Sequence, residues 1–177
     1  MKLKNFFGHL KTIRKHRRLV RKFCFRCGLY SQGLRHDLSK YAPCEFFAGV
    51  RFFQGDRSPN DMERRENGYS AAWLHHKGRN RHHWEYWQDY VPKQGLRYVE
   101  MPEKYLYEMA CDRIAACRVY HKSAYSSKDA LAYFDNSTAK NIMNEKTAEK
   151  LRSLLVVCAD EGEEAMFSLI RSRVKGK

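Results

Sequence analysis

The stretch LKNFFGHLKTIRKHRRLVRKFCFRC, residues 3–27, decides the fold class. Its apolar residues recur every three or four positions, which is the period of one helical face and not the alternation of a β-strand. Alternate steps of four and three trace an inward stripe made of His9, Ile13, His16, Val20, Phe23 and Cys27. The basic residues all fall on the remaining faces. The stretch therefore predicts a long amphipathic helix that ends near Gly28 and buries histidine.

Helical spacing recurs along the rest of the 177 residues, and no run of alternating β-branched residues interrupts it. We therefore predict an all-α fold, a single-domain helical bundle over residues 1–177 with about seven helices, divided by Gly and Pro. After a turn that holds Gly33, further helices are expected from HDLSK to before Gly55, up to His76, from Arg81 to before Pro92, from Pro102 to about residue 122, and three more after Ser126. Residues 55–60 are expected to form a loop, and residues 92–102 an irregular connection with room for a short extended piece.

Composition restricts the class of protein. The 34 Lys and Arg against 20 Asp and Glu give a formal charge of +14, and residues 1–36 hold eleven of these cations and no acid. Such a basic surface predicts an anionic partner such as a phosphate ester, a nucleic acid or an acidic lipid. The N-terminus lacks the continuous apolar region of a signal peptide, so we expect a cytoplasmic protein, no membrane association and reduced cysteines. Cys24 and Cys27 form a lone C-x-x-C, which we assign to packing.

Two apolar helix faces each carry a group that can bind a metal. One is His16 on the first helix. The other is Asp112, because the stripe on the helix after Pro102 consists of Tyr105, Met109, Asp112, Ala116 and Val119. A buried carboxylate needs a cation, an ion-pair partner or a proton. A histidine bonded to a backbone carbonyl and an aspartate paired with arginine are the alternatives that the residues leave open.

Further histidines gather in two segments. His36 and Asp37 are adjacent in HDLSK, and four of the eight histidines, His75, His76, His82 and His83, lie within nine residues of WLHHKGRNRHHWEYW, residues 73–87. Imidazole is the commonest metal-binding side chain, and mixed nitrogen and oxygen ligands suit iron, manganese or zinc. A carboxylate can bridge two such ions. Exposed histidines on a basic loop are the alternative.

The order His16, His36-Asp37, His76, His82 or His83, and Asp112 resembles the H…HD…H…H…D series of the HD-domain metal-dependent phosphohydrolase superfamily. HDLSK is similar to the HD-[I/L]-G-K motif of its cyclic-dinucleotide phosphodiesterase and inositol-oxygenase-like branches, with Ser39 in place of the glycine. Over nearly its full length, through HDLSKYAPCEF, GYSAAWLHHKGRNRHHWEYW and YLYEMACDRIAA, the chain more closely resembles a small bacterial and phage family of unknown function.

The superfamily resemblance implies an HD-domain-like bundle that binds one or two divalent transition-metal ions, Fe, Mn or Zn. It implies that His16, His36, Asp37 and Asp112 hold one ion, and that His76 with His82 or His83 serves a second. The function expected first is a metal-dependent phosphohydrolase that acts on a nucleotide or another phosphate ester. Asp37, Lys40 and Glu45 are the catalytic candidates, with Glu45 orienting the attacking water or an imidazole. Lys40, Arg79 and Asn80 are the candidates for substrate binding, and an aromatic wall for a base is predicted from Trp73, Trp84, Trp87, Tyr86 and Tyr90.

Two other functions remain open at this level. A di-iron oxygenase would use a similar ligand order on a similar scaffold. A basic nucleic-acid-binding or interaction protein with structural histidines would instead use the cations on the outer face of the first helix, which are Lys11, Arg14, Lys15, Arg18 and Lys22. A phosphate-containing small molecule is the partner expected first, and nucleic acid is the alternative. The substrate and the oligomeric state do not follow from the sequence.

Overall fold

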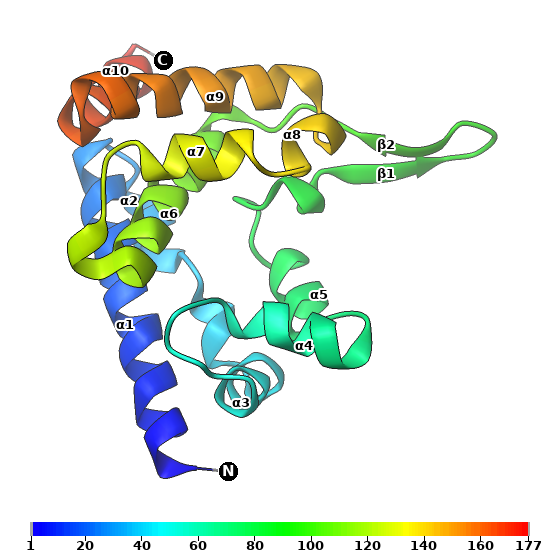
Figure 1. Ribbon diagram of the computed structural model, residues 1–177. Helices are drawn as coiled ribbons and strands as arrows, with labels where there is room; N and C mark the ends of the chain where they lie inside the picture. The colour runs from blue at the N-terminus through cyan, green and yellow to red at the C-terminus, as the bar shows by residue number, and fades with distance from the viewer. Residues whose placement is uncertain (1, 177) are drawn as a thin grey trace.

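The computed structural model describes residues 2–176 and is mostly helical, as predicted (Figure 1). Over these residues it has ten α-helices, three short 3-10 turns and one small two-stranded sheet. The helices are α1 (Leu3–Arg26), α2 (Tyr30–Arg35), α3 (Pro43–Arg51), α4 (Pro59–Asn67), α5 (Ala71–Lys77), α6 (Glu103–His121), α7 (Asp129–Asp135), α8 (Ala139–Ile142), α9 (Glu145–Glu161) and α10 (Glu163–Lys175). The strands are β1 (Gln88–Val91) and β2 (Gly95–Tyr98), and the 3-10 turns are η1 (Leu38–Tyr41), η2 (Trp84–Tyr86) and η3 (Lys122–Ala124).

The hydrophobic core lies among α1, α6, α7, α9 and α10. The predicted inward stripe of α1 is confirmed, because His9, Ile13, His16, Val20 and Phe23 are all buried on one face of this helix. Opposite α1, the middle of α6 is buried on most of its sides and packs against α9. Fully buried leucines on α9 fill the space between the helices. This close packing fixes the positions of α1 and α6, and therefore of the polar side chains that they carry.

Helices α3, α4 and α5 form a second block beside the lower part of α1 (Figure 1). Pro43 and Pro59 each occupy the first turn of a helix, where the missing N–H costs nothing. The helix predicted to follow HDLSK is confirmed as η1 and α3. The single helix predicted up to His76 is instead two helices, α4 and α5, because Gly68 adopts a left-handed φ of 78° and ends α4.

The turn predicted around Gly33 is also wrong, because residues 30–35 form the short helix α2. Helix α2 packs closely on α1, and a side chain at Gly33 would lie 2.9 Å from the Cβ atom of Cys24. The glycine is therefore needed for close approach of two helices and not for a turn. This packing also fixes the position of His36 and Asp37, because these residues directly follow α2 in the chain.

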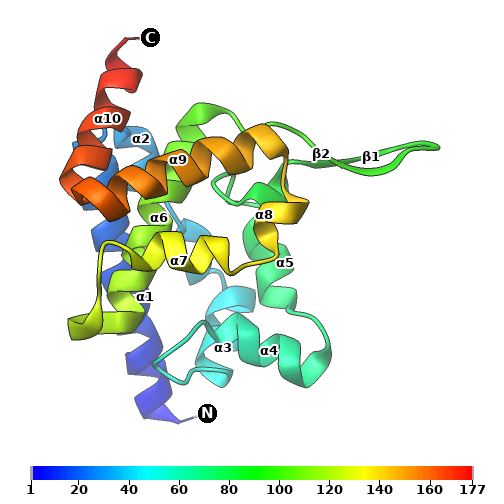
Figure 2. The ribbon, with the colours of Figure 1, turned by 45° about the horizontal axis from the view of Figure 1, so that its top comes forward.

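The helix predicted from Arg81 to before Pro92 is wrong as well, and the predicted all-α fold is confirmed as a mostly helical fold with one small two-stranded sheet. Only the η2 turn is helical in this segment, and it leads into β1, which pairs antiparallel with β2 from Gln88↔Tyr98 to Val91↔Gly95. The extended piece expected between residues 92 and 102 is confirmed as β2. Figures 1 and 2 show the hairpin projecting from the body, so few tertiary contacts support it.

Two further expectations are tested by the described residues. Among them, no helix combines the length and the apolar character needed to cross a membrane. All six cysteines are free, and Cys24 and Cys27 are buried in the core, where the Sγ atom of Cys27 lies 3.7 Å from that of Cys111. The packing role assigned to the C-x-x-C pair fits this position.

Candidate metal centre

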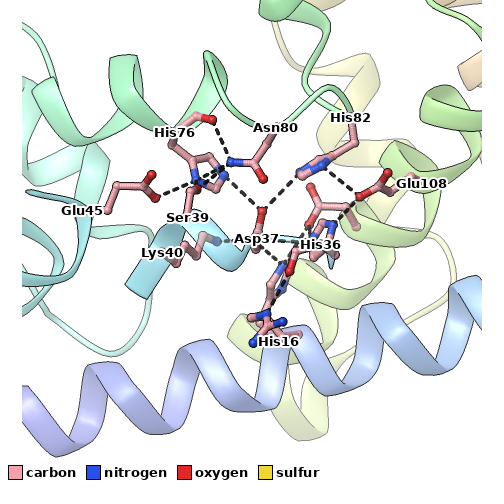
Figure 3. Close-up of polar contacts among 12 residues, drawn as sticks. His16, His36, Asp37, Ser39, Lys40, Glu45, His76, Asn80, His82 and Glu108 are labelled. Carbon is pink, nitrogen blue, oxygen red and sulfur yellow. Dashed lines mark hydrogen bonds and ion pairs between the residues drawn. The ribbon is translucent and has the colours of Figure 1, made fainter. Parts of the chain in front are cut away.

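The predicted ligand side chains meet in the interior, between the core and the α3–α5 block (Figure 3). Separate elements carry them: α1 carries His16, the α2–η1 junction carries His36 and Asp37, α5 and the turn after it carry His76, His82 and His83, and α6 carries Asp112. Asp37 adopts a left-handed backbone conformation with φ 53° and ψ 29°. This conformation is uncommon outside glycine, and such backbone strain is concentrated at functional sites.

Asp37 lies at the middle of the cluster, with its side chain 1% exposed. Its Oδ2 atom lies 3.4 Å from the Nε2 atoms of both His16 and His36. Its Oδ1 atom lies 3.3 Å from Nε2 of His76 and 3.4 Å from Nε2 of His82. The two oxygens of one carboxylate thus face two different sets of imidazoles, which is the arrangement needed to bridge two cations.

The first set consists of His16, His36, Asp37 and Asp112, whose ligand atoms all lie within 4.8 Å of one another. The Nε2 atoms of His16 and His36 are 3.3 Å apart, and Oδ1 of Asp112 is 2.9 Å from Nε2 of His16. Two ring nitrogens and two carboxylate oxygens therefore point at one small volume. When the proton of each neutral imidazole is on Nδ1, all four of these atoms present lone pairs to one another and need a cation or protons between them.

The second set consists of Asp37, His76, His82 and His83, and it satisfies the same 4.8 Å limit. Three of its atoms, Oδ1 of Asp37 and Nε2 of His82 and His83, are buried and have no hydrogen-bond partner among the described residues. Buried polar atoms without a partner are rare and costly. Their convergence fits a cation, and the mixed nitrogen and oxygen donors suit a divalent transition metal.

Two buried glutamates accept hydrogen bonds from the Nδ1 atoms of these imidazoles. Oε1 of Glu108 accepts a hydrogen bond from Nδ1 of His36 at 2.9 Å and is 3.1 Å from Nδ1 of His82. Oε2 of Glu45 accepts from Nδ1 of His76 at 2.8 Å, and its Oε1 accepts from Nδ1 of His75 at 2.6 Å. Because an ionised carboxylate only accepts, these contacts place a proton on Nδ1. In the neutral imidazoles of His36, His76 and His82 the lone pair is then on Nε2, which faces Asp37.

The roles of these two glutamates were only partly predicted. Glu45 was expected to orient an attacking water or an imidazole, and the structure places it on imidazoles. Glu108 was missed, although it lies four residues before Asp112 and thus near it along the same helix. That spacing is the signal that sequence reasoning could have used.

The pKa values of His36, Asp37 and Asp112 are shifted strongly. Burial alone would lower the pKa of His36, but Asp37 and the other surrounding carboxylates raise it well above its usual value. Burial would likewise raise the pKa of Asp37, but His36, Lys40 and His76 hold it well below its usual range. The pKa of Asp112 is lowered in the same way by His16 and His36 against the effect of burial. This set attracts positive charge, which protons or a metal ion can supply.

The second set differs, because burial lowers the pKa of His82 and lowers that of His83 still further, with neighbouring histidines adding to the effect. Burial would also lower the pKa of His76, but Asp37 and Glu45 raise it overall. His82 and His83 therefore stay neutral, and neither takes up a second proton near neutral pH. Neutral imidazoles are the form that binds metal ions.

Lys40 is placed at the centre as predicted, with its Nζ atom 2.7 Å from Oδ2 of Asp37. Arg79 is not brought there: it is exposed and donates to the backbone oxygen of His75 at 3.5 Å. Asn80 is buried, and its amide donates to Ser39 and to the backbone oxygen of His76. Asn80 therefore links the His-rich turn to η1 by hydrogen bonds. Neither Arg79 nor Asn80 lines the cavity that opens beside the cluster.

A cavity of about 550 Å³ opens beside the cluster and reaches from α1 and η1 across α6 to α7. His16, Asp37, Lys40, His76, His83 and Asp112 all line it. Of the predicted aromatic wall, Trp73 and Trp84 line the cavity, whereas Tyr86, Trp87 and Tyr90 do not. Tyr90 lies on the hairpin and is 70% exposed. The volume lies within the range of small-molecule binding sites.

Comparison with known proteins gives a family and no described function. No curated protein and no solved structure matches the chain. A model of one protein family matches residues 5–156, which cover the whole cluster from His16 to Asp112. The chain therefore belongs to the family described as "Family of unknown function (DUF5662)".

Proposed function

We propose that this protein is a metal-dependent phosphohydrolase that acts on a phosphate ester, with Asp37 as the residue shared by two divalent transition-metal ions. The observation that carries the proposal is the set of three buried atoms without partners, Oδ1 of Asp37 and Nε2 of His82 and His83. Asp37 is ionised and has no proton to donate to the Nε2 atoms of His82 and His83, and a divalent metal ion is a partner that can satisfy all three atoms at once.

We infer that the resemblance to HD-domain proteins extends to the arrangement of the ligands. The support is the order of the residues along the chain, since each position singled out in the H…HD…H…H…D series contributes an atom to one of the two sets. The predicted doubled histidine, His82 or His83, is best assigned to both, because both belong to the second set. Iron, manganese and zinc all suit these donors.

A bound divalent ion would supply Lewis acidity, which polarises a phosphoryl oxygen and makes water a better nucleophile near neutral pH. The protein's own residues do the positioning. Glu108 and Glu45 fix the orientation of the imidazoles through their Nδ1 atoms. Asp37 presents one oxygen to each set. Catalysis of phosphoryl transfer rests mainly on such positioning and on stabilisation of charge.

Lys40 supports a phosphate ester as the substrate class. Burial alone would lower the pKa of Lys40, but Asp37 and Asp112 raise it, so the ammonium group keeps its charge. It lies at the wall of the cavity and contacts Oδ2 of Asp37. A permanent cation next to the cluster stabilises negative charge on phosphoryl oxygens, whereas an oxygenase acting on a neutral polyol has no need of it. Lys40 thus favours hydrolysis over the di-iron alternative.

The nucleic-acid-binding alternative has one observation in its favour. Lys11, Arg14, Lys15, Arg18 and Lys22 are exposed on the outer face of α1, and none of them forms an ion pair within residues 2–176. This face points away from the cluster, because His16 lies on the buried side of the same helix. Binding of duplex DNA that weakens steeply with added salt would support a second role for this face. The expected cytoplasmic location stays a prediction.

Elemental analysis of the purified protein tests the metal proposal first. We expect up to two transition-metal ions per chain, fewer than one in Asp37→Ala, and the loss of one ion in Asp112→Ala, because Asp112 belongs to the first set alone. Asp160→Ala, an exposed aspartate on α9, is the matched control and should keep the full content. Absence of metal from the wild type, or full metal content in Asp37→Ala, would refute the proposal.

Hydrolysis of bis(p-nitrophenyl) phosphate without oxygen tests the reaction. The wild type should hydrolyse the diester, lose activity with a chelator and regain it with Mn²⁺ or Zn²⁺. Asp37→Ala should be inactive, with circular dichroism showing that its helices persist. Oxygen uptake with a polyol in place of diester hydrolysis would identify the oxygenase instead. Hydrolysis that survives in Asp37→Ala would show that the cluster is not the active site.

A further inference from the structure

The outer face of α1, opposite the buried side that carries His16, holds cations that the metal centre does not use. They recur at intervals of three, four and seven residues, which keeps them on one side of the helix, and they are Lys4, Lys11, Arg14, Lys15, Arg18, Arg21 and Lys22. All are exposed, and none of them forms an ion pair within residues 2–176. Figures 1 and 2 show the N-terminal half of α1 at the margin of the molecule, with α3 on one side of it and no described element on the other. This face is therefore accessible to a large partner.

Exposed apolar side chains lie on the same face. Leu3 and Phe7 are 76% and 63% exposed, and Phe7 lies one helical turn before Lys11, so it shares the side of the helix that carries the cations. At the other end of α1, the ring of Phe25 packs against that of Tyr30 on α2 with the ring centres 5.3 Å apart, and both residues are exposed. Large apolar side chains that gather on a surface mark an interaction site.

Helix α2 and η1 extend this surface beside the middle of α1. Arg17 fixes them there, because its Nε atom donates to the backbone oxygen of His36 at 2.8 Å and its guanidinium carbon lies 5.2 Å from the centre of the Tyr41 ring. In this segment Leu34 and Leu38 leave half of their surface or more in contact with water. Aliphatic side chains gain free energy when an apolar medium covers them.

The charge and the apolar residues together restrict the partner. Residues 1–36 hold eleven Lys and Arg and no Asp or Glu, so this face repels a second copy of the chain and attracts an anionic surface. Nucleic acid supplies phosphates for the cations, and its bases stack on aromatic rings, but leucines have no ring to stack on. An anionic bilayer supplies both partners, because charged headgroups lie at its surface and acyl chains lie directly beneath them.

We propose that the outer face of α1, extended by α2 and η1, docks the protein on an anionic lipid bilayer, with the cations among the headgroups and Leu3 and Phe7 inserted between them. The sequence-based expectation of no membrane association rests on the lack of a continuous apolar segment, which a helix that lies flat on a bilayer does not need. The docking does not depend on the proposed hydrolysis, because His16 points to the opposite side of α1.

Sedimentation of the full chain with lipid vesicles tests the surface. The protein should bind vesicles of equimolar phosphatidylcholine and phosphatidylserine, should bind them more weakly as salt is added, and should not bind vesicles of phosphatidylcholine alone. Circular dichroism of each variant reports whether its helices persist. Absence of binding to the phosphatidylserine vesicles would overturn the proposal.

Two matched sets of lysine substitutions test whether this face, and not the net charge, is responsible. Each basic residue near an anionic bilayer contributes about fivefold to binding, so we expect about 100-fold weaker binding from the triple variant Lys11→Gln/Lys15→Gln/Lys22→Gln. The control removes the same charge at exposed lysines outside this face and should bind nearly as the wild type does; it is Lys93→Gln/Lys128→Gln/Lys146→Gln. Equal binding by the two triple variants would refute the assignment to α1.

Replacement of the apolar residues separates a bilayer from nucleic acid. Leu3→Ser/Phe7→Ser should bind the vesicles about tenfold more weakly or less, because each serine loses the burial of a large apolar side chain. The fluorescence of Phe7→Trp should be quenched by lipids with brominated acyl chains beyond any quenching of the three native tryptophans in the wild type. Phe7→Trp that is quenched no more than the wild type would overturn the proposal. Salt-dependent binding of DNA or RNA without binding of the vesicles would also overturn it, and would assign this face to nucleic acid.

Discussion

Replacement of Glu108 tests whether the carboxylates bonded to the Nδ1 atoms orient the imidazoles for metal binding. One oxygen, Oε1, holds His36 at 2.9 Å and His82 at 3.1 Å, and the two histidines belong to different ligand sets. A single substitution should therefore weaken both metal positions together. Burial alone would raise the pKa of Glu108, but hydrogen bonds from His36 and His82 lower it, so the carboxylate is charged at neutral pH.

The expected loss of metal affinity depends on which hydrogen bonds to the two histidines each variant retains. Glu108→Gln retains an oxygen acceptor but loses the charge, and because charge-assisted hydrogen bonds are roughly twice as strong as neutral ones, we expect metal affinity to fall about tenfold. Glu108→Ala removes both bonds and frees both rings to rotate. Loss of such outer partners typically costs 10–100-fold in metal affinity, so we expect about 100-fold at each position.

Titration of chelator-stripped protein with Mn²⁺ in a calorimeter measures both the number of ions and their affinities. Thermal melting followed by circular dichroism reports whether each variant is folded. Glu66→Ala, which changes an exposed glutamate on α4, is the matched control and should bind as the wild type does. Unchanged affinity in a folded Glu108→Ala protein would refute the idea that this carboxylate orients the ligands, and loss of only one ion would show that its contact to the other histidine is not used.

Two further predictions concern the packing of α1 against α3. Burial, followed by Lys40, lowers the pKa of His9 to about 4, so the folded state resists its protonation. Stability from neutral His9 should be present above pH 6.5 and be lost as the pH falls toward 4, by about 3 kcal/mol in total. The free energy of unfolding of His9→Gln relative to the wild type, measured in urea at pH 7 and pH 4, should show this difference, and a pH-independent offset would contradict it. Gly49→Ala should destabilise the protein by about 1–3 kcal/mol, because the added Cβ would lie 2.1 Å from Nε2 of His9. Gly78→Ala, where the added atom makes only ordinary contacts, should be close to neutral in the same unfolding assay, and equal effects of the two alanines would rule out this explanation.

The long helices could be predicted from the sequence, and the short segments between them could not. In α1 and α6 the apolar period extends over several turns, so one face must be buried whatever the partner is. In residues 81–91 the aromatic residues fit a helix and a strand equally well, and the pairing of β1 with β2 decides between them. Likewise Gly33 looks like a turn residue in the sequence, and only its contact with Cys24 shows that it permits helix packing.

The sequence by itself determined which side chains are chemically able to form the centre, because His16 and Asp112 on apolar faces and the adjacent His36 and Asp37 are visible without a structure. Only the tertiary structure decided how they divide into two sets about the two oxygens of Asp37, and that Glu108 contacts one histidine of each set. The physical reason is the distance along the chain over which each property is determined. Helical periodicity is a local property of the chain, whereas a metal centre joins atoms a few ångströms apart whose residues are up to 96 positions apart in sequence, from His16 to Asp112.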